Sequence, residues 1–169
     1  MTRMGIGGHH RPRGLFDVWL TPRAVLHQLG EFDLDPCAAP DPRPWPTAKA
    51  HIALPSDGLA VDWHGRVWLN PPYHRDLIGL WMEKMSKHAN GIALIFARTE
   101  TDVWQRYVWP TATAVLFIRG RLEFAVPDGA RVKHNCGAPS ALIAYSEQDA
   151  RILRSSGIRG ALVQQIDLQ

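Results

Sequence analysis

Short runs of hydrophobic residues alternate along this chain with longer segments in which hydrophobic and polar positions repeat at helical spacing. Because continuous or two-residue hydrophobic patterns are typical of buried strands, we expect strands at residues 31–35, 67–69, 91–97, 114–118 and 140–145. Periods of three to four residues predict helices at residues 22–29, 75–89, 99–107 and 146–157. Strands separated by helices favour an α/β fold with a mostly parallel sheet covered on both faces.

The patterns also predict how individual helices begin and which side they bury. Thr21 and Pro22 are expected as the N-cap and first residue of the first helix, which ends at Gly30. Residues 99–102 match a capping box, and residues 146–149 cap the last helix. In the helix at 75–89, one hydrophobic stripe faces the core; it consists of Leu77, Leu80, Trp81 and Met85.

Three segments need separate treatment. The strand at 31–35 is expected to place Phe32 and Leu34 on one face. Residues 36–55 contain six prolines, so we expect an ordered loop with at most one helical turn. The strands at 114–118 and 140–145 have no obvious helix between them, which predicts an antiparallel hairpin at one edge of the sheet.

Length and composition limit the class of protein. At 169 residues, 46% hydrophobic and 21% charged, the chain suits one globular domain, which we place at residues 15–169 after a flexible basic tail of residues 1–14. No hydrophobic run approaches the roughly 18 residues of a membrane span. The start of the chain has no hydrophobic stretch typical of a secretory signal. We therefore expect a cytoplasmic protein without a membrane partner.

The cysteines and histidines show no disulfide or metal-binding pattern. Cys37 and Cys136 lie far apart, as in a reduced cytosolic protein, and neither belongs to a CxxC motif. The eight histidines do not fall at zinc-ligand spacing beside them, so we expect no metal site. A net charge of +3 permits a polyanionic partner without requiring one.

The tetrapeptide Asn70-Pro71-Pro72-Tyr73 directly follows the strand at 67–69 and carries the clearest chemical signal. Two prolines fix two φ angles and favour an extended Asn70, so its acceptors are held in place at little entropic cost. The Asn70 side-chain oxygen and the Pro71 carbonyl can accept both hydrogens of an exocyclic amine and localise the nitrogen lone pair. Tyr73 offers a ring on which a base extruded from a duplex can stack. These features predict methyl transfer to adenine N6 in DNA, through positioning and preorganised dipoles rather than a strong base.

The position of the tetrapeptide supports a ligand site, although single motifs also have purely structural interpretations. A doubly wound sheet binds ligands at the carboxyl ends of its strands, and Asp35 and Asn70 both lie at such ends. Residues 70–73 also fit a proline-rich turn with a core-facing tyrosine. Asp57-Gly58 also fits a simple turn.

A series of motifs in a fixed order resembles the phage-type DNA N-6-adenine methyltransferases. The N-terminal motifs are Thr21-Pro22, Asp33-Leu34-Asp35-Pro36-Cys37-Ala38, Asp57-Gly58-Leu59 with Trp63, and Val67-Trp68-Leu69-Asn70-Pro71-Pro72-Tyr73. The C-terminal motifs are Gly120-Arg121-Leu122-Glu123-Phe124, Pro127-Asp128-Gly129 and Pro139-Ser140-Ala141. The resemblance runs from about Leu20 to Tyr145, and the combination is more specific than any single motif.

The resemblance implies a Rossmann-like methyltransferase fold, S-adenosylmethionine as cofactor, and a bacterial or phage-infected host cell as the setting. It implies that the cofactor is held by Thr21, Pro22, Asp35, Pro36, Cys37, Ala38, Asp57 and Leu59. Within that set, Asp35 can pair with the ammonium of the methionine moiety. Asp57 can accept the amine of the cofactor's adenine ring, on which Leu59 packs. The target base is assigned to Asn70, Pro71, Pro72 and Tyr73.

The sequence departs from the usual pattern of such enzymes at one position. An acidic residue commonly follows the second strand and holds the cofactor ribose, but here the proline-rich stretch occupies that interval. There is also no segment for a large target-recognition domain, so double-stranded DNA would be read by loops such as 98–104 and 121–139. Arg98, Arg119 and Arg121 follow strands and suit either a DNA contact or a solvated edge.

Two other functions stay open at this point. The same tetrapeptide suits any planar amide or amine, so an S-adenosylmethionine-dependent N-methyltransferase acting on RNA or on protein glutamine is one alternative. The other is a non-catalytic DNA-binding domain on a methyltransferase-like fold, which would fit the missing ribose acid. That alternative predicts salt-sensitive DNA affinity without a cofactor-induced thermal shift.

Overall fold

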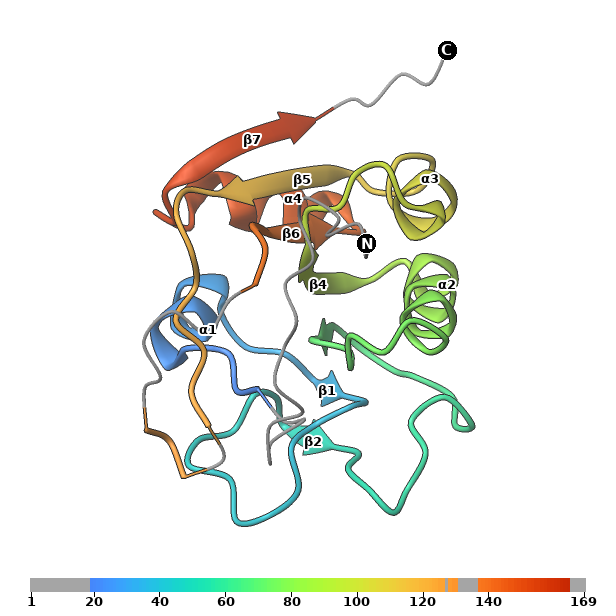
Figure 1. Ribbon diagram of the computed structural model, residues 1–169, viewed down its shortest axis with the longest axis vertical. Coiled ribbons are helices and arrows are strands. Elements are labelled where there is room, and N and C mark those ends of the chain that lie inside the picture. The colour runs from blue at the N-terminus through green and yellow to red at the C-terminus, as the bar shows by residue number, and fades with distance from the viewer. Residues whose placement is uncertain (1–18, 127, 131–136, 165–169) are drawn as a thin grey trace, which may run out of the picture.

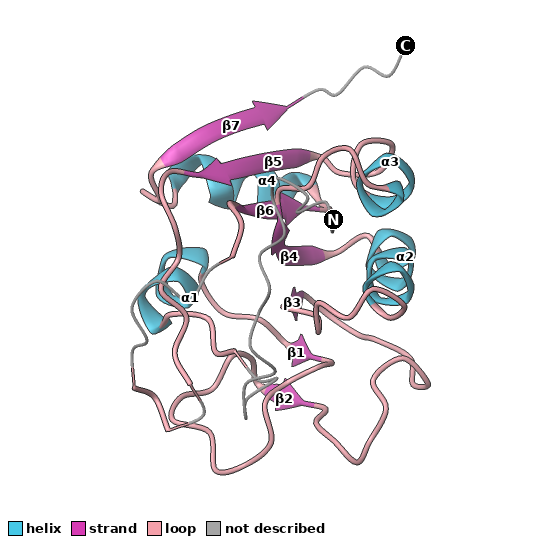
Figure 2. Ribbon diagram, in the orientation of Figure 1, coloured by secondary structure: helices cyan, strands magenta, loops and turns pink. Residues whose placement is uncertain are grey.

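A seven-stranded sheet lies between helices on both faces in the computed structural model, which describes residues 19–126, 128–130 and 137–164 (Figure 1; Figure 2). The expected tail of residues 1–14 lies outside these residues. The helices are α1 (Arg23–Leu29), α2 (Ile78–His88), α3 (Asp102–Tyr107) and α4 (Glu147–Ser155). The strands are β1 (Leu34–Asp35), β2 (Ala50–His51), β3 (Val67–Leu69), β4 (Gly91–Phe96), β5 (Ala114–Ile118), β6 (Ser140–Ala144) and β7 (Gly160–Gln164).

The sheet has a parallel half and an antiparallel half. Its strand order is β2-β1-β3-β4-β6-β5-β7, and the first four strands are parallel to one another. β6 is antiparallel to both β4 and β5, and β7 is antiparallel to β5. The α/β class and the parallel strands agree with the sequence prediction.

The antiparallel part is larger than the predicted edge hairpin. β5 and β6 do pair antiparallel, as the sequence indicated. They do not form the edge, however, because β6 is inserted between β4 and β5 and the later strand β7 pairs with the outer side of β5. The prediction of an edge hairpin was therefore wrong in its placement.

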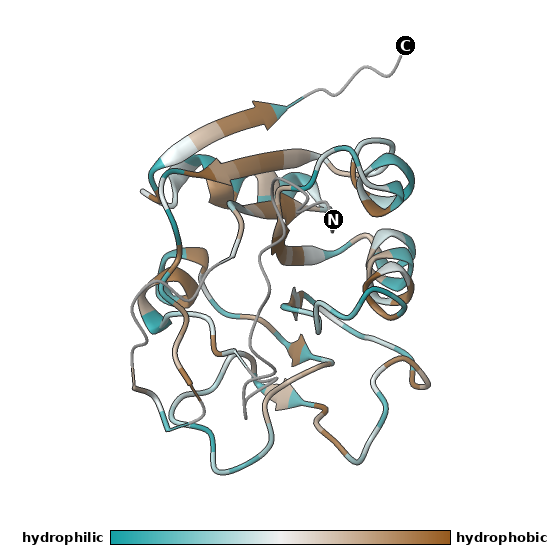
Figure 3. Cartoon of the chain, viewed as in Figure 1, coloured by the Kyte–Doolittle hydropathy of each residue, from teal (hydrophilic) through white to brown (hydrophobic). Residues whose placement is uncertain are grey.

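Alternation along the strands divides the hydrophobic core into two clusters, one on each face of the sheet. Ile92 and Leu94 of β4 pack in the cluster that includes α1 and α4. Ala93 and Ile95 pack in the cluster that includes α2 and α3. Hydrophobic colour covers most of β5, as expected for a strand with a helix-covered face, whereas the helices mix hydrophobic and polar residues (Figure 3). In Figure 1, α1 lies on one side of the sheet and α2 and α3 on the other.

The first helix begins one residue later than predicted. Pro22 is its N-cap and Arg23 its first residue, so Thr21 does not cap it. Thr21 is instead buried, with 1% of its surface exposed. The predicted end is confirmed, because Gly30 follows α1 with a φ of 78°, a conformation that favours glycine.

Of the two caps predicted for later helices, one forms and one does not. α3 begins at Asp102 with Thr101 as N-cap and without a side-chain capping bond, so the capping box at 99–102 does not form. Ser146 does cap α4, because its hydroxyl accepts a bond from the Asp149 amide.

Two predictions about buried side chains were wrong. Leu77 and Leu80 are 40% and 50% exposed, because α2 begins only at Ile78 and buries the stripe Trp81, Met82 and Met85. Phe32 and Leu34 belong to opposite core clusters, because the chain bends at Asp33 before β1 begins.

The proline-rich segment 36–55 is an irregular loop without helix, as predicted, but it contains the short strand β2. None of the helices in the described part of the chain is long and hydrophobic enough to cross a membrane. Among the described residues, no group of three or more His, Cys, Asp or Glu side chains is placed to hold a metal ion.

Candidate functional site

Most of the predicted site residues directly follow the carboxyl ends of the parallel strands, at one edge of the sheet. β1 leads into residues 36–38, β3 into residues 70–73, and β4 into Arg98. From β1 the chain crosses to β2 on one side and then to β3 on the other, so strand order reverses between β1 and β3. Such a reversal opens a crevice at the carboxyl ends of the strands, which is where open α/β sheets bind ligands.

Asp35 ends β1 inside the protein, with 4% of its surface exposed. One carboxylate oxygen accepts a bond from the Cys37 amide at 3.1 Å, and the other accepts a bond from the Thr47 hydroxyl. Thr47 reaches it because β2 runs beside β1, with the Ile52 amide bonded to the Asp35 carbonyl at 2.9 Å. Burial raises the pKa of Asp35 to about 6, against the lowering effect of these bonds.

Contacts between loops bring three of the predicted motifs together. The Cys37 thiol donates to the Asn70 backbone carbonyl at 3.3 Å, which joins the loop after β1 to the loop after β3. Gly58 lies against Pro36 so closely that an added Cβ would be 1.8 Å from the Pro36 carbonyl oxygen. The Trp63 indole donates to the Gly58 carbonyl at 2.7 Å and so holds the turn at residues 57–59 from its other side.

Asp57 and Leu59 form a turn at the border of this region. Asp57 is exposed, and its Oδ1 accepts a bond from the Leu59 amide at 2.9 Å. Lys84 of α2 donates to the Leu59 carbonyl at 2.7 Å. The turn interpretation of Asp57 is thus confirmed, while its contact with a cofactor ring stays a prediction.

The segment before α1 lies over the end of β3. The Asn70 side-chain amide donates to the Trp19 carbonyl at 3.1 Å, and the Trp45 indole donates to the Thr21 carbonyl at 3.2 Å. Leu20 also pairs with Ala125 through two backbone bonds. These contacts hold Trp19, two residues before Thr21, against Asn70.

Asn70 has an amide orientation that the protein itself determines. The Trp19 carbonyl can only accept, so it must face the Nδ2 end of the amide, and the Oδ1 end points elsewhere. That Oδ1 atom is buried and has no hydrogen-bond partner among the described residues. Such an unpaired buried acceptor costs about 1–3 kcal/mol.

Unpaired buried polar atoms concentrate in the predicted site. Among the described residues, three buried side-chain atoms lack a partner: Thr21 Oγ1, Arg66 Nη2 and Asn70 Oδ1. Two of the three residues are ones that the sequence assigned to the site. Since native proteins pair nearly all buried polar groups, these two atoms are exceptions within the predicted site.

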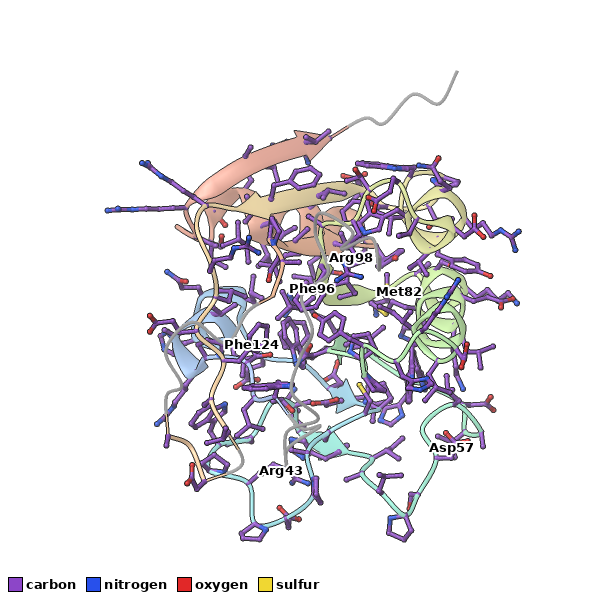
Figure 4. All side chains as sticks on the ribbon, viewed as in Figure 1. Arg43, Asp57, Met82, Phe96, Arg98 and Phe124 are labelled. Carbon is purple, nitrogen blue, oxygen red and sulfur yellow. The ribbon has the colours of Figure 1, made fainter. Side chains whose placement is uncertain are left out.

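Tyr73 is held on the end of β4. Its hydroxyl donates to the Leu94 carbonyl at 3.1 Å, and its ring is stacked on Phe96 with centroids 4.1 Å apart and planes 15° apart. The Arg98 guanidinium carbon lies 5.7 Å from the Phe96 ring centroid. Figure 4 shows Phe96 and Arg98 close together near the centre of the view, with Arg43 and Asp57 on loops below them. A base that stacks on Tyr73 has to use the ring face away from Phe96.

The two prolines of the tetrapeptide differ in exposure, and two of the three predicted DNA-binding arginines lie away from Asn70. Pro71 is buried and Pro72 is exposed. Arg119 and Arg121 follow β5, which is separated from β3 by β4 and β6, so the structure does not bring them to Asn70.

Sequence reasoning missed two residues of this region. Thr47 lies in the proline-rich loop and contacts Asp35 only because β2 folds back beside β1. Phe96 resembled an ordinary core position, although an aromatic residue at the carboxyl end of a parallel strand was a usable signal. β2 ends at His51, whose ring accepts a bond from the Thr47 amide at 3.1 Å, and residues 52–56 contain no acidic residue.

Comparison with known proteins identifies the family of this chain. The model of the family "DNA N-6-adenine-methyltransferase (Dam)" matches residues 8–165. The chain is 26% identical over 122 residues to the DNA N-6-adenine-methyltransferase of Escherichia phage T1, which covers 68% of this chain and 50% of that protein. This chain therefore spans about half the length of that relative, and no solved structure matches it significantly. Because the family model covers nearly the whole chain, the protein belongs to the DNA N-6-adenine-methyltransferase (Dam) family.

Proposed function

We propose that the protein transfers a methyl group from S-adenosylmethionine to N6 of adenine in double-stranded DNA. The observation that carries the proposal is the Asn70 amide oxygen, a buried acceptor without a partner at the carboxyl end of β3. The family and the phage relative's name support adenine in DNA as the substrate.

The acceptor side of the reaction needs two fixed hydrogen-bond acceptors. Adenine N6 is a poor nucleophile because its lone pair is delocalised into the ring. The Asn70 Oδ1 atom and the Pro71 carbonyl would accept its two hydrogens, and the bond from Asn70 Nδ2 to Trp19 keeps the oxygen available. Fixed dipoles of this kind contribute at no reorganisation cost during the reaction.

Access to Asn70 requires a local movement. Its Oδ1 atom is shielded from water, while the residue as a whole is partly exposed. The Trp19 carbonyl covers the Asn70 side-chain amide and accepts a hydrogen bond from it. An extruded base would therefore displace part of this covering before its amine reaches the oxygen, and Tyr73 of the same loop would stack on the base.

The donor side fits S-adenosylmethionine. That cofactor supplies an electrophilic methyl group when it is bound. The Asp35 carboxylate lies at the reversal of strand order, the Thr21 hydroxyl is buried without a partner, and Gly58 lets the 57–59 turn approach Pro36. With a pKa of about 6, Asp35 is largely ionised at neutral pH and can pair with the ammonium of the methionine moiety.

The remaining family residues complete this assignment. Pro22, Pro36, Cys37 and Ala38 would line the methionine side, and Asp57 and Leu59 would contact the adenine ring. The switch in strand order between β1 and β3 supports a Rossmann-like, doubly wound arrangement of the parallel half. Arg98, beside the Tyr73–Phe96 stack, would contact a phosphate near the extruded base.

The test compares variants of the acceptor and donor sides with a matched control. Asn70→Ala should lower methyl transfer by about 100-fold or more, as loss of a preorganised group commonly does, while calorimetry shows cofactor affinity nearly unchanged. Asp35→Ala should instead weaken cofactor binding. Asn90→Ala is the control, because Asn90 donates a similar bond to the Gly65 carbonyl at 2.9 Å near the opposite edge of the sheet.

Tritiated methyl transfer to DNA, RNA and protein in parallel identifies the acceptor. Label in N6-methyladenine of DNA supports the proposal. Label in RNA or in glutamine supports the alternative enzyme, and DNA binding without cofactor binding supports a non-catalytic domain. A parental rate for Asn70→Ala shows that the assignment of Asn70 is wrong.

A further inference from the structure

We propose that a surface hollow at the end of β5 and the start of β7 binds a phosphate group of the DNA backbone, away from the target base. This inference rests on the proposed function, since it takes DNA as the substrate. Three arginines from three elements line the hollow: Arg119, Arg154 and Arg159. The rest of its lining is Phe117, Gly157, Ile158, Gly160 and Ala161, so it contains no acidic side chain.

Two of these arginines lie directly opposite each other on neighbouring strands. The β5–β7 ladder pairs Ile118 with Gly160, and the Arg119 amide continues it by donating to the Arg159 carbonyl at 2.9 Å. Side chains in such cross-strand positions are about 5 Å apart, and like charges there destabilise a sheet. A pair of arginines in this position therefore favours an anion between or above them.

Arg154 adds a third positive charge from a different direction. It lies in the last turn of α4, where a cation interacts favourably with the helix dipole. Its guanidinium donates to the Gln164 side chain at the end of β7 farthest from Arg159, so Arg154 adds positive charge to this side of the molecule without contacting the Arg119–Arg159 pair. The dipole of α4 accounts for Arg154, but it does not account for Arg119 and Arg159.

No described acidic side chain neutralises the three arginines. None of the three forms an ion pair with a described residue, in contrast to Arg43 and Arg66, which pair with Asp41 and Asp149. Guanidinium groups bind phosphate oxygens through two parallel bonds. Gly160 lets β7 lie close to β5 at the hollow, since an added Cβ would be 2.2 Å from the Phe117 carbonyl oxygen.

The hollow opens at the same edge of the sheet as the candidate active site. β6 is antiparallel to both β4 and β5, so β5 runs in the same direction as β3. Arg119 therefore leaves the sheet at the edge where Asn70 leaves it, three strand spacings or about 14 Å to the side and three residues farther along the strand direction. Phosphates follow one another at about 3.4 Å per base pair along a strand, so a duplex lying across the strand ends would place this contact about four steps from the target adenine.

The test removes the charges and keeps the chain length. Arg119→Gln combined with Arg159→Gln should weaken affinity for a duplex about tenfold and lower the slope of log affinity against log salt by one to two. Arg154→Gln should have a smaller effect of the same sign. Arg106→Gln is the control, because Arg106 is an exposed arginine in the last turn of α3, which returns toward the opposite edge.

Steady-state kinetics and DNA length separate this site from the catalytic site. The double variant should raise KM for DNA and leave kcat at saturating DNA unchanged. Shortening the duplex to about two base pairs beyond the target on one side should weaken binding to the parent protein but not to the double variant, because the phosphate four steps away is then missing.

The outcomes distinguish this inference from the proposed function. If the parent methylates DNA and the double variant binds with parental affinity, or loses no more than Arg106→Gln, the inference is wrong and the function stands. If the double variant loses DNA binding but the parent transfers no methyl group, the inference stands and the function is wrong. Equal sensitivity of parent and double variant to duplex length also overturns the inference.

Discussion

The Cys37 thiol donates a hydrogen bond to the Asn70 backbone carbonyl, with 3.3 Å between sulfur and oxygen. The bond spans the reversal of strand order between β1 and β3 and so links the proposed donor loop to the proposed acceptor loop. Burial raises the pKa of Cys37 well above its ordinary value, and the Asp35 charge adds to that effect. The thiol therefore stays protonated at neutral pH and remains a donor.

Replacing Cys37 tests whether this bond positions Asn70. Cys37→Ala removes the donor, and a net hydrogen bond of about 1 kcal/mol corresponds to about a fivefold lower kcat, with smaller changes in KM for DNA and cofactor. Cys37→Ser keeps a donor and should recover part of the rate. Methyl-transfer kinetics measure both variants. An unchanged kcat in Cys37→Ala, or a serine variant no faster than the alanine variant, contradicts the positioning role.

Close packing at Gly58 forms a second link, between the turn at residues 57–59 and the loop after β1. A Cβ at Gly58 would lie 1.8 Å from the Pro36 carbonyl oxygen, so Gly58→Ala must move the turn. We expect a loss of about 1–3 kcal/mol in stability, as for other overpacked positions, and at least tenfold weaker cofactor binding by calorimetry. Gly79→Ala in α2 is the control, because nothing lies within 4 Å of its added Cβ. It should keep or raise stability, and equal effects of both variants would contradict the prediction.

The sequence predicts best those features that depend on local pattern. Strands β3 to β6 follow from hydrophobic runs, and Asn70 lies at the end of one of them as expected. β7 was missed because all five of its residues are partly or largely exposed, only three of them are clearly hydrophobic, and its pairing depends on β5. Leu77 and Leu80 were placed in the core because a helical period does not show where the helix starts.

The candidate site shows the same limit. Motifs located the loops after β1 and β3 and the turn at residues 57–59, and the structure brings them into contact through Cys37 and Gly58. Thr47 could not be found in this way, because its bond to Asp35 depends on β2, a strand of two residues within a proline-rich loop. The roles assigned to these residues stay predictions for the experiments.

Asp35 makes stability depend on pH in a definite direction. Burial raises its pKa from 3.8 to about 6 in the folded protein, so the folded state binds more protons than the unfolded state between these values. The stability contributed by the protonated form is therefore present below pH 3.8 and is lost as pH rises through about 6. A difference of about two pKa units corresponds to about 3 kcal/mol.

Asp35→Asn tests this dependence in cofactor-free protein. The variant should be more stable than the parent at pH 8, and the advantage should shrink at pH 5; urea unfolding at both values measures it. Asp33→Asn is the control, and its stability relative to the parent should change with pH in the opposite direction. The reason is that bonds from the Arg66 amide and Lys49 lower the pKa of Asp33. A constant difference between Asp35→Asn and the parent at both pH values would refute the burial effect.

A buried ion pair lies near the opposite edge of the sheet. The Arg66 guanidinium donates to Asp149 at 2.6 Å and to the Leu29 carbonyl at 2.9 Å, while the other Asp149 oxygen accepts from the Gly91 amide at 2.8 Å. Asp149 is fully buried and Arg66 is 8% exposed. The pair thus joins α4, the start of β3, the start of β4 and the end of α1.

Breaking this pair should destabilise the protein strongly without a specific effect on the site. Asp149→Asn leaves the Arg66 charge buried and uncompensated, so we expect a loss of about 3–5 kcal/mol in urea unfolding. Adding Arg66→Met removes that charge and should recover part of the loss, whereas Glu83→Gln, which breaks the exposed pair with Lys87, should change stability little. Cofactor affinity of the folded fraction should stay near the parental value, because the pair lies at the amino ends of the strands. If Asp149→Asn is no more harmful than Glu83→Gln, or if Arg66→Met worsens it, the pair does not hold these four elements together.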